Sequence, residues 1–156
     1  MITIDIPGFR TLELAHVACD YNGTLAEDGR LIPGVAELFT TLAASVSIHV
    51  ITADTFGIAQ SELAGLPVEL HIIGSASQDQ AKLDFVNGLG AEQVVAIGNG
   101  RNDRLMLKGA ALGIALIQRE GASAGTVASA DIISAGITDA LELLLNPKRL
   151  IATLRS

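Results

Sequence analysis

Residues that could do chemistry stand directly after apolar runs in this chain. Asp20 follows the run Leu12–Cys19 and precedes Asn22-Gly23, where a glycine permits a sharp turn. A carboxylate at the tip of a strand can attack phosphorus and form an aspartyl-phosphate, which divides one difficult transfer into two easier steps. An isolated Asp-x-Asn-Gly sequence is better explained by an aspartate that only opens a turn, so Asp20 needs support from other residues.

Two further side chains suit the binding of a phosphoryl group. Thr52 follows the apolar run Val46–Ile51, and its hydroxyl could donate a hydrogen bond to a phosphate oxygen. Taken alone, Thr52 is better explained as a cap for the helix expected after Asp54. Lys82 lies near the start of a helix expected from Gln78, where its ammonium could neutralise developing negative charge. A single lysine is usually only a solvated surface charge.

A fourth apolar run, Val94–Ile97, leads into the loop Gly98–Asp103. Its glycines let the backbone approach a ligand closely. Asn99 and Asp103 could supply oxygen ligands to Mg²⁺, which prefers such ligands in near-octahedral geometry. A simple loop followed by a helix start explains this segment equally well.

The elements that must position these residues alternate along the chain. Strands are expected at Leu12–Cys19, Val46–Ile51, Val68–Ile73, Val94–Ile97, Leu112–Leu116 and Ile132–Ile133. Helices are expected at Val35–Ala44, Gly57–Leu63, Gln78–Leu89, Asp103–Lys108 and Thr138–Leu145. This alternation predicts an α/β fold with a doubly wound, mainly parallel sheet. Ligands of such sheets bind at the carboxyl ends of the strands, where the four polar segments lie.

The chain shows no linker or repeat, so residues 1–156 are expected to form a single domain. Residues 1–14 are expected to form an N-terminal hairpin, with strands Ile2–Ile6 and Thr11–Leu14 around the turn Pro7–Arg10.

Composition narrows the class of protein. Hydrophobic residues make up 49% of the 156 residues but aromatic residues only 3%, so the core must be aliphatic. A net charge of −7 argues against binding to a nucleic-acid backbone or an anionic membrane through bulk electrostatics. Apolar runs such as Ala110–Ile117 are far shorter than the ~20 residues of a membrane span. Because no secretory signal is visible, we expect a cytoplasmic protein, with Cys19 as a small buried hydrophobe.

Taken together, the four segments resemble the haloacid dehalogenase (HAD) superfamily, and specifically the phosphorylation domain of P-type ATPases and its soluble relatives. Asp20-Tyr21-Asn22-Gly23-Thr24 resembles the family's Asp-x-Asp-Gly-Thr and the pumps' Asp-Lys-Thr-Gly-Thr. Thr52 and Lys82 match the second-motif hydroxyl and the third-motif lysine, and Gly98–Asp103 resembles the pumps' Gly-Asp-Gly-x-Asn-Asp. The resemblance extends from about Ala15 to Leu154.

This resemblance implies a HAD-like Rossmannoid fold and a Mg²⁺-dependent reaction in which Asp20 attacks a phosphoryl group. The implied catalytic residues are Asp20, Asn22, Thr52 and Lys82. The implied phosphate-binding residues are Asp20, Thr52, Lys82 and Asn102. The implied Mg²⁺ ligands are Asp20, Asn22, Asn99 and Asp103.

Two amides depart from the pattern of the family. Asn22 stands where the phosphatases carry an aspartate that protonates the leaving group and then activates water, and an amide cannot transfer that proton. Because acid–base catalysis is typically worth about 10²–10⁴-fold, Asn22 predicts slow turnover. Asn99 stands where the family carries an acidic Mg²⁺ ligand, so the metal shell has one charge less. The pumps also lack the first aspartate, which suits a long-lived phosphoenzyme.

The segments between the motifs are too short for a nucleotide-binding insert or a cap domain. The site is therefore expected to be open, with Ala26–Leu31 as a short flap and Arg30 or Arg101 as substrate contacts or merely solvated charges. An open site admits a phosphorylated macromolecule, or a small phosphorylated molecule if a second copy of the chain covers it. We expect a phosphorylated substrate and favour a homo-oligomer.

The leading interpretation is a Mg²⁺-dependent phosphohydrolase or phosphotransferase that forms an aspartyl-phosphate on Asp20. The alternative is a catalytically impaired module that keeps the fold and binds phosphate and Mg²⁺ in a regulatory or interaction role. A receiver-like domain phosphorylated by a partner is a third interpretation, but it leaves the loop Gly98–Asp103 unexplained.

Overall fold

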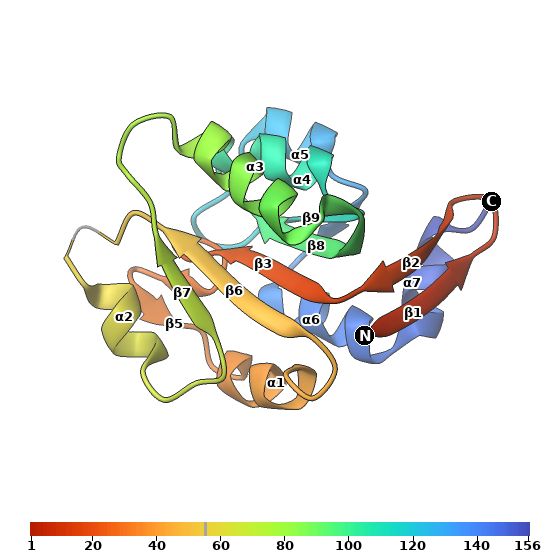
Figure 1. Cartoon of the computed structure of the whole chain (residues 1–156), viewed down its shortest axis with the longest axis horizontal. Coiled ribbons are helices and arrows are strands. Elements are labelled where there is room, and N and C mark those ends of the chain that lie inside the picture. Colours follow the sequence, from red (N-terminus) through yellow and green to blue (C-terminus); the bar gives the residue numbers. More distant parts are fainter. Residues whose placement is uncertain (55) are drawn as a thin grey trace.

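A parallel sheet of six strands forms the centre of the computed structural model, which describes residues 1–54 and 56–156 (Figure 1). In spatial order its strands are β10 (Ile132–Ser134), β9 (Leu112–Leu116), β8 (Val94–Gly98), β3 (His16–Asp20), β6 (Ser47–Thr52) and β7 (Glu69–Ile72). Every neighbouring pair is parallel. The chain order reverses at β3, so the carboxyl ends of β3 and β8 lie at a topological switch point. The prediction of a doubly wound α/β fold is confirmed.

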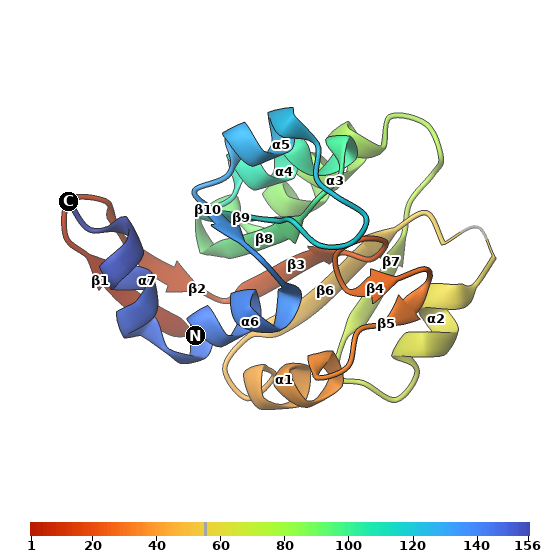
Figure 2. The ribbon, with the colours of Figure 1, turned by 180° about the vertical axis from the view of Figure 1, so that it is seen from behind.

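Helices cover both faces of the sheet, which is why β8 and β9 are buried along their whole length. One face carries α3 (Gln78–Leu89), α4 (Arg104–Gly109) and α5 (Ala124–Ser129), whereas α1 (Val35–Leu42) and α6 (Ile137–Leu145) lie on the other face (Figures 1 and 2). A separate buried aliphatic cluster fills the space beneath each layer. Helix α2 (Ile58–Leu63) lies beside the hairpin that follows β3. No helix in the described part of the chain is long and apolar enough to cross a bilayer.

The N-terminal hairpin corrects one predicted strand. β1 (Ile2–Ile6) pairs in antiparallel fashion with β2 (Arg10–Leu14), as predicted, and α7 (Pro147–Leu154) packs against it (Figure 2). The single strand predicted over Leu12–Cys19 is wrong, because the chain leaves β2 at Leu14 and enters β3 at His16. Burial alternates along β2 and is nearly continuous along β3, as expected for strands covered on one face and on two.

The other boundaries differ by only a few residues from those predicted. Strand Leu112–Leu116 and helix Gln78–Leu89 are confirmed at both ends. Helices α5 and α7 were not predicted: α5 is a short run of small residues, and Pro147 at the first position of α7 was an available start signal.

A small hairpin takes the place of a cap domain. Strands β4 (Ala26–Glu27) and β5 (Arg30–Leu31) pair in antiparallel fashion and are joined by a two-residue turn. Both turn residues, Asp28 and Gly29, have positive φ, of 51° and 82°. Such turns match the twist of the flanking strands. Tyr21 Oη donates a hydrogen bond to Gly29 O at 2.8 Å and so anchors the turn to the end of β3. In the described residues, the chain between β3 and α3 contains this hairpin, α1, β6, α2 and β7, and no cap domain.

Gly113 in β9 sets how closely α4 approaches the sheet. A Cβ atom at this position would lie 2.3 Å from Leu107 O in α4. Because this oxygen is a backbone atom, it cannot move away through a change of rotamer. We expect Gly113→Ala to lower the free energy of unfolding by about 1–3 kcal/mol, as overpacking of a core does. Denaturant unfolding measures this change. The matched control is Gly88→Ala in α3, whose Cβ meets no atom within 4 Å and which should raise stability by about 0.5–1 kcal/mol. Equal effects of the two substitutions would contradict this account of the packing.

Burial, with a smaller contribution from the Glu62 and Asp54 carboxylates, raises the pKa of Tyr21 to about 12. Because the chain has one tyrosine and no tryptophan, the ultraviolet absorbance of phenolate reports on Tyr21 alone. We expect the folded protein to titrate near pH 12. A pKa that is higher in the folded state stabilises the fold fully below the unfolded value near 10, and this contribution is lost as the pH rises through 12. A midpoint near 10 in folded protein would show that Tyr21 is solvated.

Candidate active site

A buried lysine joins two carboxylates at the carboxyl ends of β3 and β8. Lys82 Nζ donates hydrogen bonds to Asp20 Oδ1 and to Asp103 Oδ1, both at 2.7 Å. Asp20 is the last residue of β3, Lys82 lies near the start of α3, and Asp103 ends the 3₁₀ turn Arg101–Asp103 after β8. All three side chains are buried. The sequence left open whether Lys82 was a surface charge, and the structure excludes that interpretation.

Asp103 is held from both of its oxygen atoms. While Oδ1 accepts from Lys82, Oδ2 accepts the backbone N–H groups of Asn99 at 3.0 Å and Gly100 at 2.9 Å. This close packing requires glycine at position 98, where a Cβ would lie 2.5 Å from Asp103 Cγ. Asp103 does not line the adjoining pocket. In this arrangement Asp103 positions Lys82 and the loop, and its role as a Mg²⁺ ligand stays a prediction.

The second oxygen of Asp20 lies beside the amide of Asn99. Thr24 Oγ1 is 3.3 Å from Asp20 Oδ2 and 3.2 Å from Asn99 Oδ1. Asn99 Nδ2 donates to Gly121 O at 3.0 Å, which fixes the amide so that its oxygen faces Thr24. One hydroxyl proton cannot satisfy two acceptors fully, so the two oxygen atoms retain acceptor capacity toward the pocket.

An open pocket of about 460 Å³ lies over this cluster. Its lining includes Asp20, Lys82 and Asn99 from the cluster, together with the predicted residues Asn22, Thr52 and Asn102. Thus, every predicted site residue either lines the pocket or belongs to the cluster beneath it.

The polar residues at the rim are positioned by local hydrogen bonds. Asp54 accepts the N–H groups of Ala59 at 2.8 Å and Gln60 at 3.2 Å, so Asp54 caps the first turn of α2. The interpretation of Thr52 as that cap is therefore wrong, and its buried hydroxyl faces the pocket. Asn102 Nδ2 donates to Gln78 Oε1 at 2.8 Å, which joins the loop after β8 to the start of α3.

The environment shifts two pKa values in the cluster. Burial, together with repulsion from Asp103, raises the pKa of Asp20 to about 7, and the Lys82 ammonium opposes this shift. Burial would lower the pKa of Lys82, but the carboxylates of Asp20 and Asp103 outweigh it, so the net shift is upward. Perturbed carboxylates in a pocket are typical of functional sites.

The oxygen atoms of this site fit Mg²⁺ chemically. Asp20 Oδ2 and Asn99 Oδ1 are hard donors that converge at one edge of the pocket, and Asn22 lies at the same rim. Hard oxygen ligands, few in number and open to water, are what Mg²⁺ prefers in proteins. The chain supplies less charge here than a site with aspartates at 22 and 99.

Sequence reasoning assigned no role to Thr24 or Gln78. Thr24 was present in the first motif, and its position four residues after Asp20 was the available indication. The Gln78 contact depends on how α3 meets the loop after β8, and no pattern in the chain predicts that approach.

An uncharacterized relative matches about half of the chain. No family model matches the chain. An uncharacterized protein of Methanocaldococcus jannaschii is 49% identical over 83 residues, which make up 51% of this chain and 89% of that protein.

Solved structures share the fold at low sequence identity. A cobalt-bound deoxy-D-mannose-octulosonate 8-phosphate phosphatase of Haemophilus influenzae matches with a TM-score of 0.72 and 15% identity, over 92% of this chain and 94% of the other. The corresponding phosphatase of Moraxella catarrhalis, in complex with magnesium, phosphate and a KDO molecule, gives 0.66 and 20% over the same shares. A HAD-superfamily phosphatase of Bacteroides thetaiotaomicron gives 0.61 and 11%, over 90% and 96%. The chain therefore belongs to one family with the M. jannaschii protein and has the fold of the HAD superfamily, as the resemblance in its sequence implied.

Proposed function

We propose that this chain is a Mg²⁺-dependent phosphohydrolase or phosphotransferase that forms an aspartyl-phosphate on Asp20. The observation that carries the proposal is the position of Asp20 in the open pocket, where it is bound by the buried Lys82 and adjoins the amide oxygen of Asn99. The Moraxella catarrhalis structure, which has the same fold and contains magnesium and phosphate, supports it.

The two oxygen atoms of Asp20 have different surroundings, which suggests different roles. Oδ2 lies on the side of Asn99 Oδ1, where the hard donors of the site gather, so Oδ2, Asn99 Oδ1 and Asn22 would hold Mg²⁺. Oδ1 lies next to the Lys82 ammonium and is the oxygen left to attack phosphorus. Bound Mg²⁺ would neutralise charge between the carboxylate and the phosphoryl group.

The other pocket residues bind the transferred group. Lys82, Thr52 and Asn102 carry donors at the pocket and would hold the phosphoryl oxygens in line with Asp20. Phosphoryl transfer depends mainly on such positioning and on neutralisation of charge. When both carboxylates are ionised, they and the ammonium give the cluster a net charge of −1, which favours a divalent cation over an unaccompanied phosphate dianion.

The pocket has room for more than a phosphate group. Phe56 is 87% exposed and lines the pocket beside Ile58, so the rim offers an apolar contact to the remainder of a substrate. The substrate class is a phosphorylated macromolecule, or a small phosphorylated molecule when a second copy of the chain covers the open face.

Asn22 makes the enzyme slow and its phosphoenzyme long-lived, as in the phosphorylation domain of P-type ATPases. The position lacks a group that can protonate the leaving oxygen or activate water.

A non-catalytic binding module is the second candidate function, and Asn99 is the observation that favours it. Its amide Nδ2 donates to Gly121 O, a contact that an aspartate could not make. The loop is therefore built around an uncharged residue at this ligand position.

Replacement of the nucleophile tests the leading proposal. We expect Asp20→Asn to reduce hydrolysis of an activated aryl phosphate in the presence of Mg²⁺ by at least about 10³-fold, because no covalent intermediate can form. The control is Asp84→Asn, an exposed residue of α3 that does not line the pocket, which should keep full activity. Circular dichroism checks that both variants fold. Equal rates for wild type and Asp20→Asn would exclude the mechanism.

Restoration of the missing acid tests the role of Asn22. We expect Asn22→Asp to accelerate hydrolysis by about 10²–10⁴-fold, since a carboxyl can transfer the proton. Acid-quench trapping with labelled substrate should show less phosphoenzyme at steady state than in wild type. Asn87→Asp adds the same charge at an exposed position in α3 and should change neither quantity. An Asn22→Asp variant with no turnover and no phosphoenzyme would favour the binding module.

A further inference from the structure

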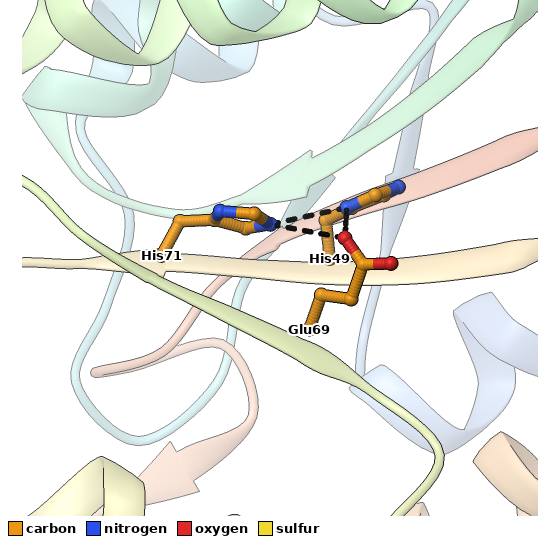
Figure 3. Close-up of side chains that lie close together, drawn as sticks. All are labelled: His49, Glu69 and His71. Atoms are coloured by element: carbon orange, nitrogen blue, oxygen red, sulfur yellow. Dashed lines mark hydrogen bonds and ion pairs between the residues drawn. The ribbon is translucent and has the colours of Figure 1, made fainter.

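The three histidines of the chain lie together, far along the sequence from one another. His16 is in β3, His49 in β6 and His71 in β7, on three adjacent strands. His49 is paired with Glu69, which precedes His71 by two residues and therefore points to the same face of the sheet. Figure 3 shows His49, Glu69 and His71 turned toward one another.

Three ligand atoms form a nearly regular triangle. His49 Nδ1 lies 3.2 Å from His71 Nε2 and 3.3 Å from Glu69 Oε2, and the latter two atoms are 3.6 Å apart (Figure 3). A zinc ion with tetrahedral bonds of about 2.0–2.1 Å to nitrogen and oxygen keeps its ligand atoms about 3.3–3.4 Å apart. The triangle therefore has the size that such an ion requires.

Hydrogen bonds cannot satisfy all three contacts of this triangle at once. The Glu69 carboxylate only accepts, so both imidazole nitrogens would have to carry protons for both of them to donate to it. Two N–H groups would then face each other across the 3.2 Å between His49 and His71. If either nitrogen, His49 Nδ1 or His71 Nε2, loses its proton, its lone pair faces the oxygen Glu69 Oε2 instead. A cation at the centre satisfies all three atoms at once.

The surroundings suit a metal site. His16 Nδ1 lies 3.1 Å from His49 Nε2, so His49 can donate its remaining N–H to His16 while Nδ1 coordinates. Such a partner usually fixes the orientation of a metal-binding imidazole. The ring centroids of Phe85 and His71 lie 4.3 Å apart, so Phe85 packs against His71 on the side of the site that faces α3. Glu69 is 66% exposed, which gives an ion access from solvent.

The histidine site is separate from the candidate active site. Thr52 lines the candidate pocket and lies three residues after His49 on β6, whereas His71 is paired with Ile51, the residue before Thr52. None of the three ligands, His49, Glu69 and His71, lines that pocket. Among residues 1–54 and 56–156, the group of His49, Glu69 and His71 is the one set of three histidine, cysteine or acidic residues whose ligand atoms all converge in this way.

We propose that His49, Glu69 and His71 form a Zn²⁺-binding site on the sheet, with His16 as the residue that positions His49. Two imidazoles and one carboxylate favour a borderline metal such as Zn²⁺ over Mg²⁺, which prefers oxygen ligands alone. Three protein ligands leave the fourth tetrahedral position to water. Because β7 is an edge strand, the ion would fasten it to β6 through side chains.

Imidazole NMR tests the site directly, because every histidine of the chain belongs to it. Zn²⁺ is added to ¹⁵N-labelled, chelator-treated protein in the presence of excess Mg²⁺, and long-range ¹H–¹⁵N spectra are recorded. We expect saturation at one Zn²⁺ per chain, with coordination shifts at His49 Nδ1 and His71 Nε2 and none at the nitrogens of His16. Asp20→Asn should leave this behaviour unchanged. Zinc binding that leaves all imidazole signals in place would overturn the proposal and assign the ion to the catalytic carboxylates.

Two ligand substitutions provide an independent measurement. We expect Glu69→Gln and His71→Ala each to weaken Zn²⁺ binding by at least about tenfold, measured in competition with a chromogenic chelator. Loss of a residue that only hydrogen-bonds to a metal ligand already costs about tenfold in metal affinity, so loss of a ligand should cost at least as much. Glu69 is exposed, so its variant should fold normally. Glu37→Gln is the matched control, an exposed glutamate of α1 on the opposite face of the sheet, and should bind as wild type does. Unchanged affinity in Glu69→Gln would contradict the site.

Discussion

The ion pairs of Lys82 with Asp20 and Asp103 are the constraint on which the candidate active site depends. A buried ammonium between two buried carboxylates is tolerated because each charge has a partner, and loss of one partner from a buried pair typically costs about 3–5 kcal/mol. The interaction ties α3 to the end of β3 and to the loop after β8. Because Asp103 also binds the N–H groups of Asn99 and Gly100, the loop that presents Asn99 is fixed by the same interaction.

The amides at positions 22 and 99 act on this site in different ways. Asn22 is exposed at the rim, so a change of this side chain acts on proton transfer and on the proposed metal ligand without disturbing buried contacts. Asn99 is buried, and its Nδ2 is used by Gly121 O, so the loop depends on the amide. A carboxylate at 99 would add charge for a metal but would place an oxygen against that carbonyl. Asn22 is therefore the position where catalytic power could be regained without rebuilding the loop.

Much of the candidate site could be predicted because the relevant residues end apolar strands. Parallel strands bring Asp20, Thr52 and Asn99 to one edge of the sheet, whatever the details of packing. Two features depend on how α3 meets the loop after β8, which no local sequence pattern encodes. They are the burial of Lys82 and the position of Asp103 beneath the pocket rather than in its lining. The break at Ala15 was missed because apolar residues continue on both sides of it, with only Glu13 and His16 as polar residues between Leu12 and Cys19. The alternation along Thr11–Leu14 nevertheless distinguishes an edge hairpin from a buried strand.

The histidine triangle could not be predicted, since it arises from the register of two strands, β6 and β7, rather than from spacing along the chain. His49 faces Glu69 only because β6 and β7 pair in the observed register, and a shift of one residue would turn Glu69 and His71 to the other face. The same sheet thus carries two donor sets of different chemistry. Oxygen atoms gather at the carboxyl ends of β3 and β8, whereas the imidazoles lie on one face of β6 and β7 and do not line the pocket. The oxygen ligands of the first set suit Mg²⁺ and the imidazoles of the second suit Zn²⁺, so the two proposed sites favour different metals.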